Sequence, residues 1–234
     1  MNVAGVQQAA IVTPSTMRWD NNVTFDAVDK HPDRFVAVVR VDTSDADGMV
    51  NLRDLLHRGA VGVRITLFGV QSPPTLVEKV ADQMGTLLSD RNGVAEFHVS
   101  PEQLSMVEAF SIRHPNLRIV IDHLGRPVPG TQGSEEHQNF LRLADRPNVF
   151  AKTPGLGFFS EEPFPHGDLT PFLHAALDCF GAERIMWGSD WPGSDEFSAY
   201  QQTLNGMKIQ LARRSAAERA AVLSGTFERL FLSN

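Results

Sequence analysis

The chain has 234 residues, of which 42% are hydrophobic and 21% charged, and its formal net charge is −7 at pH 7. This length accommodates one large single-core domain, and a complete (β/α)8 barrel takes about 250 residues. An acidic chain without basic runs does not fit nucleic acid or an anionic membrane surface as a partner, because both need a basic face. A small molecule is therefore the expected substrate.

Several features of the sequence predict a cytoplasmic protein. The single cysteine, Cys179, cannot form an internal disulfide, which favours a reducing compartment. The first residues, MNVAGVQQAAIVTP, lack the basic and long apolar regions of a signal peptide. No apolar run approaches the roughly 18 residues that a membrane span requires.

Short apolar runs, each followed by a longer amphipathic segment, recur along the chain. The runs are apolar on nearly every residue, which is typical of parallel strands that are covered on both faces. Strand–helix alternation of this kind predicts a parallel sheet with right-handed crossovers in one domain, residues 1–234. The seven predicted strands are Ala9–Val12, Phe35–Val41, Val61–Thr66, Val94–Val99, Leu117–Asp122, Val149–Thr153 and Arg184–Trp187.

Local signals place some of the helices and one long loop. Leu169–Phe180 is apolar along one face at a period of 3.6 residues, which predicts a helix. Ser100 with Gln103, and Ser215 with Glu218, have the spacing of capping boxes that begin helices. The Pro- and Gly-rich stretch Pro154–Asp168 follows a strand directly, so it is either a functional loop or a plain surface excursion.

Polar side chains stand at the ends of four predicted strands. Arg64, His98, His123 and Asp190 each close an otherwise apolar run. Each alone has an ordinary explanation, since a strand histidine is often a hydrogen-bonded core residue and an aspartate often begins a turn. In a parallel β/α barrel, however, catalytic groups lie at the carboxyl ends of several strands. The coincidence of four such residues at one end favours an active site.

Two further carboxylates are interpreted as supporting groups. Glu96 shares a strand face with His98 and needs a partner if it is buried, so we expect it to pair with Arg64 of the adjacent strand. Asp122 has the opposite parity to His123. The alternation therefore places His123 on the active-site face and Asp122 in a supporting or structural role.

Two motifs at a characteristic spacing resemble a known family. The segment VIDHLGRP at residues 120–127, followed by WGSDWP at residues 187–192, is similar to the amidohydrolase-related family of TIM-barrel hydrolases. The closest branch in appearance is the 2-pyrone-4,6-dicarboxylate hydrolase and sugar-lactonase group. The strands around Gly62–Arg64 and Ala151–Lys152 and the amino-terminal segment through Phe35 also resemble that group, so the likeness covers essentially the whole chain.

The resemblance implies a role for each candidate residue. Asp190 would be the general base that activates water, and His123 would lie beside the scissile carbonyl, as a metal ligand or as a polarising group. These residue types suit the chemistry, because an ionised carboxylate accepts a proton from water and an imidazole stabilises a developing oxyanion. The expected substrate-binding residues are Arg64, which could hold a carboxylate, together with His98, Ser15 and Lys152.

The sequence also departs from the family's pattern. The family's first strand ends in a His-x-His motif that supplies two metal ligands, and this chain contains no such motif. We therefore expect a (β/α)8-type barrel that lacks strand one. A zinc or other divalent metal would have only His98, His123 and Asp190, so no tightly bound metal is expected without the missing strand. Val70 and Phe158 replace arginines of the pyrone hydrolases, which favours a lactone or ester less acidic than a dicarboxylate.

Two other functions and a structural consequence stay open. One alternative is a metal-dependent amidohydrolase or decarboxylase whose first strand is lost from this chain, and the other is a non-catalytic remnant that serves as a binding module. A barrel without one strand exposes the edges of the Ala9–Val12 and Arg184–Trp187 strands. Direct pairing of these edges, a covering segment such as Thr226–Phe231 or homo-oligomer formation would relieve this, and we expect dimerisation or aggregation.

Overall fold

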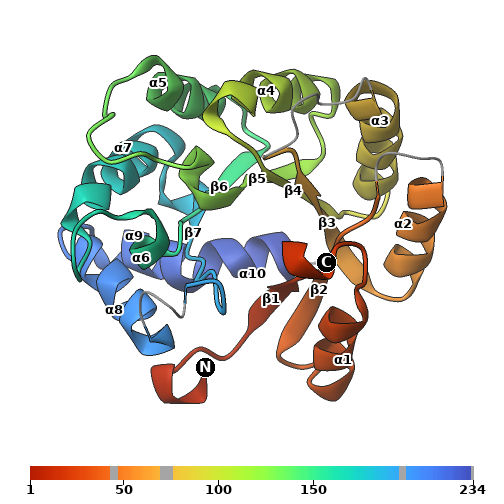
Figure 1. The fold of residues 1–234 in the computed structure, drawn as a ribbon, viewed down its shortest axis with the longest axis horizontal. Coiled ribbons are helices and arrows are strands. Elements are labelled where there is room, and N and C mark those ends of the chain that lie inside the picture. The colour runs from red at the N-terminus through yellow and green to blue at the C-terminus, as the bar shows by residue number, and fades with distance from the viewer. Residues whose placement is uncertain (43–46, 69–75, 195–198, 233–234) are drawn as a thin grey trace.

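The computed structural model describes residues 1–42, 47–68, 76–194 and 199–232, without the side chains of residues 76–79. Its centre is a curled sheet of seven strands in the order β1 to β7 (Figure 1). Every neighbouring pair of strands is parallel, as the sequence predicted. The strands are β1 (Ala9–Val12), β2 (Phe35–Val39), β3 (Ala60–Thr66), β4 (Val94–His98), β5 (Arg118–Ile121), β6 (Val149–Lys152) and β7 (Ile185–Met186).

Helices surround the curled sheet and connect its strands (Figure 1). None of the helices in the described part of the chain combines the length and the apolar character of a membrane span. The α-helices are α1 (Asn22–Lys30), α2 (Asp47–His57), α3 (Leu76–Ser89), α4 (Leu104–Arg113), α5 (Glu135–Arg142), α6 (Leu156–Phe159), α7 (Thr170–Phe180), α8 (Tyr200–Gln210), α9 (Ala216–Ala220) and α10 (Thr226–Phe231).

The sequence signals for helix ends are confirmed. Reciprocal hydrogen bonds form the capping box of Ser215 with Glu218, before α9. Before α4, the N–H of Ser100 donates to Gln103 Oε1, which is one of the two bonds of the expected box. The long stretch Pro154–Asp168 is less irregular than expected, because it contains the short helix α6. It belongs to the end of the molecule where the strands' carboxyl ends lie.

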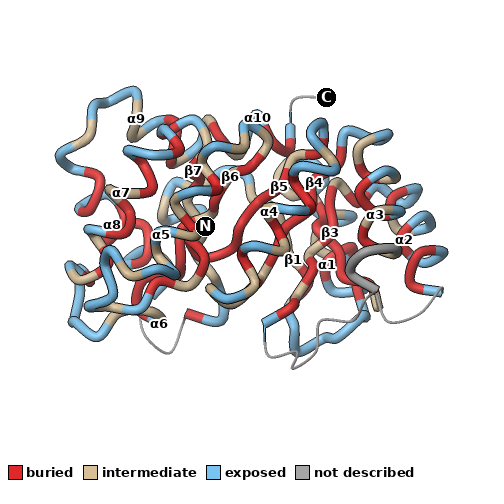
Figure 2. The backbone as a smooth tube through the Cα atoms, turned by 90° about the horizontal axis from the view of Figure 1, so that it is seen from above, coloured by how far each residue is buried: buried red, intermediate tan, exposed pale blue. Residues whose placement is uncertain are grey.

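Two apolar layers cover the two faces of the sheet, and the colouring in Figure 2 follows them as buried backbone along the strands. The outer layer joins strand residues such as Val39 and Phe97 to the inner sides of the helices. The inner layer is smaller and lies within the curl. Its buried members are Val38, Val94, Val120, Met186, Leu230 and Phe231.

Helix α10 fills the interior of the curled sheet at one end. Leu230 and Phe231 pack on the inner strand residues, and the helix lies across the space between β7 and β2 in Figure 1. The carbonyl oxygen of Arg229 accepts a bond from Arg118, the first residue of β5, so α10 lies at the amino ends of the strands. Figure 2 shows the same helix opposite the loops that follow the strands.

Strands β1 and β7 form the two edges of the curled sheet. Strands β1 and β7 are not paired with each other. The backbone N–H of Trp187, just after β7, donates to the carbonyl oxygen of Val222 at 2.8 Å, so the π-helical segment Ala221–Gly225 before α10 supplies a partner beyond that edge. The terminal segment therefore covers the gap in part, and dimerisation stays a prediction.

Candidate active site

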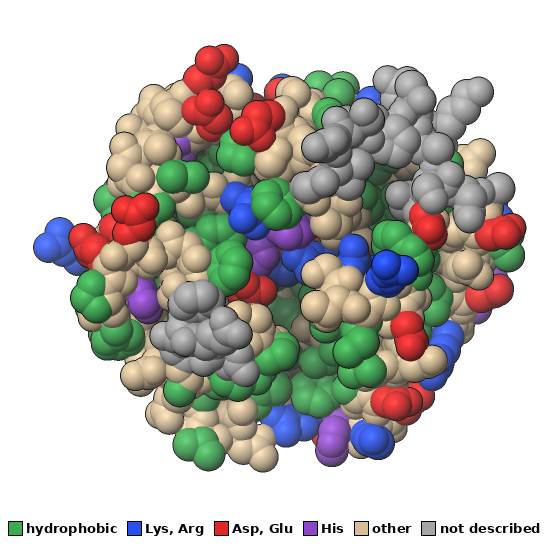
Figure 3. Space-filling view, viewed as in Figure 1, with side chains coloured by type: hydrophobic (Ala, Val, Ile, Leu, Met, Phe, Trp, Pro, Cys, Tyr) green, Lys and Arg blue, Asp and Glu red, His purple; other side chains and the backbone are tan. Residues whose placement is uncertain are grey.

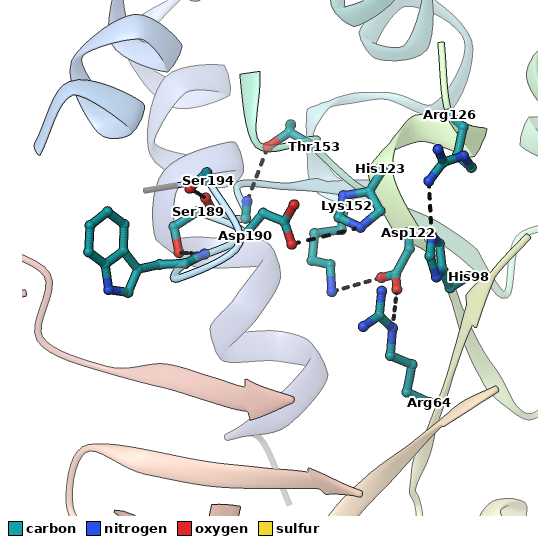
Figure 4. A network of polar contacts seen from close by, with 12 residues as sticks. Arg64, His98, Asp122, His123, Arg126, Lys152, Thr153, Ser189, Asp190 and Ser194 are labelled. Carbon is teal, nitrogen blue, oxygen red and sulfur yellow. Dashed lines mark hydrogen bonds and ion pairs between the residues drawn. The ribbon is translucent and has the colours of Figure 1, made fainter. Parts of the chain in front are cut away.

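The predicted site residues meet in one hollow at the carboxyl ends of the strands. Arg64 lies near the end of β3, His98 ends β4 and Lys152 ends β6, while His123 and Asp190 stand in the turns that follow β5 and β7. Figure 4 shows the five side chains directed toward one another. In the space-filling view, histidine and basic side chains gather in the centre of this face (Figure 3). We refer to this region as the active-site hollow.

A buried network of four charges forms the floor of the hollow. Arg64 Nε donates to Asp122 Oδ2 at 2.7 Å. Lys152 Nζ lies 2.7 Å from Asp122 Oδ1 and 2.9 Å from Glu96 Oε2. Two cations therefore balance two carboxylates. The expected Arg64–Glu96 ion pair was wrong, because Glu96 pairs with Lys152 instead.

The two carboxylates of this network respond differently to burial. Burial acts to raise the pKa of Asp122, but the charges of Lys152 and Arg64 overcome it and hold this pKa well below its ordinary value. Glu96 is 1% exposed, and burial raises its pKa despite Lys152. A buried carboxylate stays ionised only when partners compensate for lost solvation, and Asp122 has two such partners.

His123 does not reach the hollow through the strand alternation that we used to predict its orientation. Ile119 and Ile121, whose face it was expected to share, belong to the outer layer, and Val120 belongs to the inner one. Asp122 therefore has the inward parity and joins the floor of the hollow. His123 reaches the hollow because its backbone is left-handed, with φ 55° and ψ 36°, which turns the side chain back over the strand ends.

Asp190 is held in a tight turn after β7. Its φ is 53°, and the N–H of Ser194 donates to its carbonyl oxygen at 2.9 Å. Its side chain is 32% exposed, and Oδ1 lies 4.0 Å from His123 Nε2. Burial raises the pKa of Asp190, although the positive charges of Lys152 and Arg64 oppose the shift. This carboxylate is thus a stronger base than an aspartate in water.

Both histidines of the hollow are neutral near neutral pH. Burial lowers the pKa of His123 to about 3. Burial, followed by the charge of Arg64, lowers the pKa of His98 to about 4. The two rings lie edge to face, with centroids 5.4 Å apart.

Arg126 is a site residue that the sequence reasoning missed. One of its guanidinium nitrogens lies 3.1 Å from His98 Nε2, as Figure 4 shows. The guanidinium carbon lies 3.8 Å from the centre of the Phe68 ring and 5.1 Å from that of Phe159, so two aromatic rings fix it. Its position within the motif at residues 120–127 was the available signal.

The residues proposed as metal ligands do not fit a metal as they stand. The guanidinium of Arg126 occupies the side of His98 Nε2 that a cation would need. Metal-binding histidines almost always donate their other ring N–H to an acceptor, yet neither Nδ1 of His98 nor that of His123 has a hydrogen-bond partner among the described residues. Across the described residues, no group of three or more His, Cys, Asp or Glu side chains is arranged to hold a metal.

Ser15 and Phe158 lie at the rim, and Val70 lies outside the described residues. Ser15 is exposed in a short turn after β1. Phe158 belongs to α6 and is 49% exposed. Its neighbour Phe159 stacks at 5.2 Å on the ring of His123, so the loop after β6 does reach the active-site hollow.

A separate cavity of about 270 Å³ lies beyond the turn that carries His123. Neither His123 nor Asp190 lines it, so it is not the place where their chemistry occurs. Arg126 is the one active-site residue on its wall, and the other lining residues include Leu124, His137, Phe140 and Phe172.

Comparison with known proteins identifies the family. A family model described as amidohydrolase matches residues 1–232. The chain belongs to the amidohydrolase family. It is therefore a hydrolase, as the motifs at residues 120–127 and 187–192 indicated.

Two relatives of this amidohydrolase are named as lactone hydrolases. The 4-sulfomuconolactone hydrolase of Rhizobium radiobacter is 29% identical in an alignment of length 238 that covers 99% of this chain and 77% of that protein. The L-fucono-1,5-lactonase of Burkholderia ambifaria is 32% identical in an alignment of length 198 that covers 82% of this chain and 67% of that protein.

Solved structures agree with the fold. An amidohydrolase from Burkholderia multivorans with bound HEPES has a TM-score of 0.84 at 25% identity and covers 100% of this chain and 86% of its own. A probable 2-pyrone-4,6-dicarboxylic acid hydrolase from Acinetobacter baumannii, with citric acid bound, has a TM-score of 0.86 at 22% identity. The match covers 99% of this chain and 86% of that protein. A structure of the Burkholderia multivorans protein with bound zinc has a TM-score of 0.85 at 23% identity. This match covers 100% of this chain and 86% of that protein.

Proposed function

We propose that this amidohydrolase hydrolyses a small lactone or related cyclic ester, with Asp190 activating water and His123 polarising the carbonyl. The observation that carries the proposal is the pair of facing atoms, Asp190 Oδ1 and His123 Nε2, 4.0 Å apart. This separation is too long for a hydrogen bond. It leaves room for an oxygen atom of water or substrate within reach of both groups.

The reaction that these groups support has a simple proton balance. Asp190 accepts a proton from water as the water oxygen attacks the lactone carbonyl carbon. His123, neutral because of its burial, stabilises the oxyanion through a ring N–H. The ring C–O bond then breaks, and the alkoxide takes the proton back from Asp190. The product is a hydroxy acid, and the enzyme returns to its starting state.

The buried network supports this chemistry from below. Lys152 and Arg64 oppose the rise in the pKa of Asp190, and their positive charges therefore favour the ionised carboxylate. Both cations already pair with buried carboxylates. In this proposal they therefore hold the floor of the hollow in place and lower the pKa of Asp190. Direct contacts of Arg64, Lys152, His98 and Ser15 with substrate stay predictions.

A metal-dependent amidohydrolase or decarboxylase is the second candidate, favoured by the zinc in the Burkholderia multivorans structure. The guanidinium of Arg126 on His98 Nε2 weighs against it for this chain. A metal-free reaction should keep its rate in the presence of a chelator, and a metal-dependent one should lose it and recover on addition of zinc.

The first prediction tests the role of Asp190. In the D190N variant, kcat/KM for an active lactone should fall by about 10²–10⁴, because the water loses its general base. Asp145 is an exposed carboxylate on a surface turn, and D145N is the matched control, expected to retain wild-type activity. Steady-state hydrolysis of a panel of five- and six-membered lactones measures both. A D190N rate within threefold of the wild type would remove Asp190 as the base.

A further inference from the structure

A second arginine closes a strand beside the active-site hollow. Arg40 directly follows β2 and continues the inward parity of Val36 and Val38, which pack in the inner apolar layer. It is only 6% exposed. Neither the motifs nor the proposed reaction gives it a role.

The backbone of Arg40 is fixed by a buried asparagine. Asn21 Oδ1 accepts from the N–H of Arg40 at 2.8 Å, and Asn21 Nδ2 donates to its carbonyl oxygen at 2.9 Å. The hydroxyl of Thr13, just after β1, donates to the same Oδ1 at 2.7 Å. These bonds tie the ends of β1 and β2 together and hold the arginine in one place.

The guanidinium of Arg40 lacks a counter-charge. Among the described residues, no carboxylate lies within ion-pair distance of it, and its Nε has no hydrogen-bond partner. Its contacts are the carbonyl oxygen of Pro14 at 3.5 Å and the ring of Trp19 at 5.1 Å. A buried cation without a partner is costly, so this position calls for an anion.

Within the described part of the chain, the charges near Arg40 do not supply that anion. Burial lowers the pKa of Arg40, and the positive charge of nearby Arg64 lowers it further. The carboxylates of Asp122 and Glu96 are already balanced by Arg64 and Lys152. Arg64 in turn interacts electrostatically with Asp190. Arg40 follows the carboxyl end of β2, the end of the parallel sheet at which the active-site hollow lies.

We propose that Arg40 binds an anionic substituent of the substrate, so that the preferred substrate is a lactone carrying one carboxylate or sulfonate group. This rests on the proposed lactone hydrolysis. A guanidinium suits either group, because its fork of N–H donors matches two anionic oxygens. One guanidinium fork matches one acidic group, so the proposal names a single anionic substituent.

Arg126 is the competing anion site. It too lacks a carboxylate within ion-pair distance in the described part of the chain, but it donates to His98 and lies between two aromatic rings. Arg40 has an unused donor and less exposure. The experiment therefore compares R40M with R126M.

The test uses three lactones that differ in charge: a butenolide with a carboxymethyl group, the same compound with a sulfonate, and its neutral methyl ester. In R40M, kcat/KM for the anionic compounds should fall by about 10- to 150-fold, the loss expected for a charge-assisted hydrogen bond, with less than threefold change for the ester. Of the carboxylate and the sulfonate, the preferred anion is the one whose compound loses more kcat/KM in R40M. R58M, which alters an exposed arginine stacked on Phe25, is the control.

A binding measurement separates this proposal from the proposed function. The lactam analogue of the carboxymethyl compound cannot be turned over readily, and calorimetry measures its affinity for wild type, R40M and R40K. If the wild type binds the lactam, R40M binds it at least tenfold more weakly and no lactone is hydrolysed, the anion site stands and the lactonase function fails. If R40M does not fold, R40K should keep part of the affinity by keeping the charge. Equal binding by wild type and R40M, absence of binding, or loss confined to R126M would overturn the proposal.

Discussion

At the scale of single residues, the pH dependence of the reaction should report on Asp190. A protonated carboxyl cannot accept a proton from water, so kcat/KM should rise with pH through the pKa of Asp190 and then level off. Burial raises this pKa, so the rising limb should lie at higher pH than an ordinary aspartate would give. His123, with a pKa of about 3, stays neutral across the same range.

This second prediction is checked with a neutral lactone from about pH 4 to about pH 9, where the measured limb belongs to the free enzyme. The limb should change little with temperature, because carboxyl ionisation has a small enthalpy. A limb that moves with temperature as an imidazole does would instead assign the titration to a histidine.

The gathering of the site residues was predictable, but their orientations were not. Carboxyl ends of parallel strands meet at one end of a barrel, so Arg64, His98 and Asp190 could be brought together from the sequence alone. The left-handed backbone of His123 breaks the alternation on which its placement relied. The partner of Glu96 was missed because Lys152 reaches it from β6, beyond the adjacent strand.

Arg40 shows a related limit of strand reading. It lies inside the apolar run Phe35–Val41, and a polar residue within such a run was its only signal. Its role in the proposal depends on the absence of a carboxylate partner among the residues that the structure describes, which only the packed structure can show. The same holds for Arg126, whose contacts come from three separate segments of the chain.

At the scale of elements, the segment after β6 positions the catalytic turn after β7. Gly155 precedes α6, and a Cβ there would lie 2.7 Å from the Cβ of Asp190 and 3.2 Å from its Oδ2. Only glycine leaves room for this approach. The loop after β6 therefore bears on the position of the carboxylate, not only on the rim of the hollow.

The third prediction follows from this contact. In the G155A variant, the added methyl group should displace the Asp190 side chain and lower kcat by about 10- to 100-fold. A catalytic group misplaced by about 1 Å can cost about 10²-fold in rate. Thermal unfolding should change much less than activity. G167A lies in the same loop and would meet only the flexible end of Glu162, at 3.1 Å, so it is the matched control with near wild-type activity. A G155A enzyme with unchanged kcat would show that the turn does not depend on this packing.

The elements themselves were the most predictable level of the structure. All seven strands stand where apolar runs indicated, because strands covered on both faces are apolar throughout. Helix α6 was not predicted, since its segment Leu156–Phe159 is too short to show a helical period and lies between glycines and prolines. Its Phe159 nevertheless contacts the ring of His123.

At the scale of the whole molecule, α10 belongs to the core of the curled sheet. Leu230 is 1% exposed and Phe231 4% exposed, and both pack on inner residues of the strands, such as Val38 and Val120. In a complete barrel the strands' own side chains fill this interior. Here a helix from the end of the chain supplies part of the filling, at the opposite end from the active-site hollow.

The last prediction tests whether α10 stabilises the fold in this way. L230A should lower the free energy of unfolding by about 2–5 kcal/mol, the usual cost of truncating a buried leucine, because the inner layer cannot close around the lost volume. Leu232 lies two residues further along and is 37% exposed, so L232A should change stability by less than about 0.5 kcal/mol. Urea unfolding followed by circular dichroism measures both variants. If both variants lose equally little free energy of unfolding, the packing of α10 contributes little to the stability of the fold. The inner strand residues must then be covered in some other way, and pairing of the β1 and β7 edges between two chains is the structural candidate.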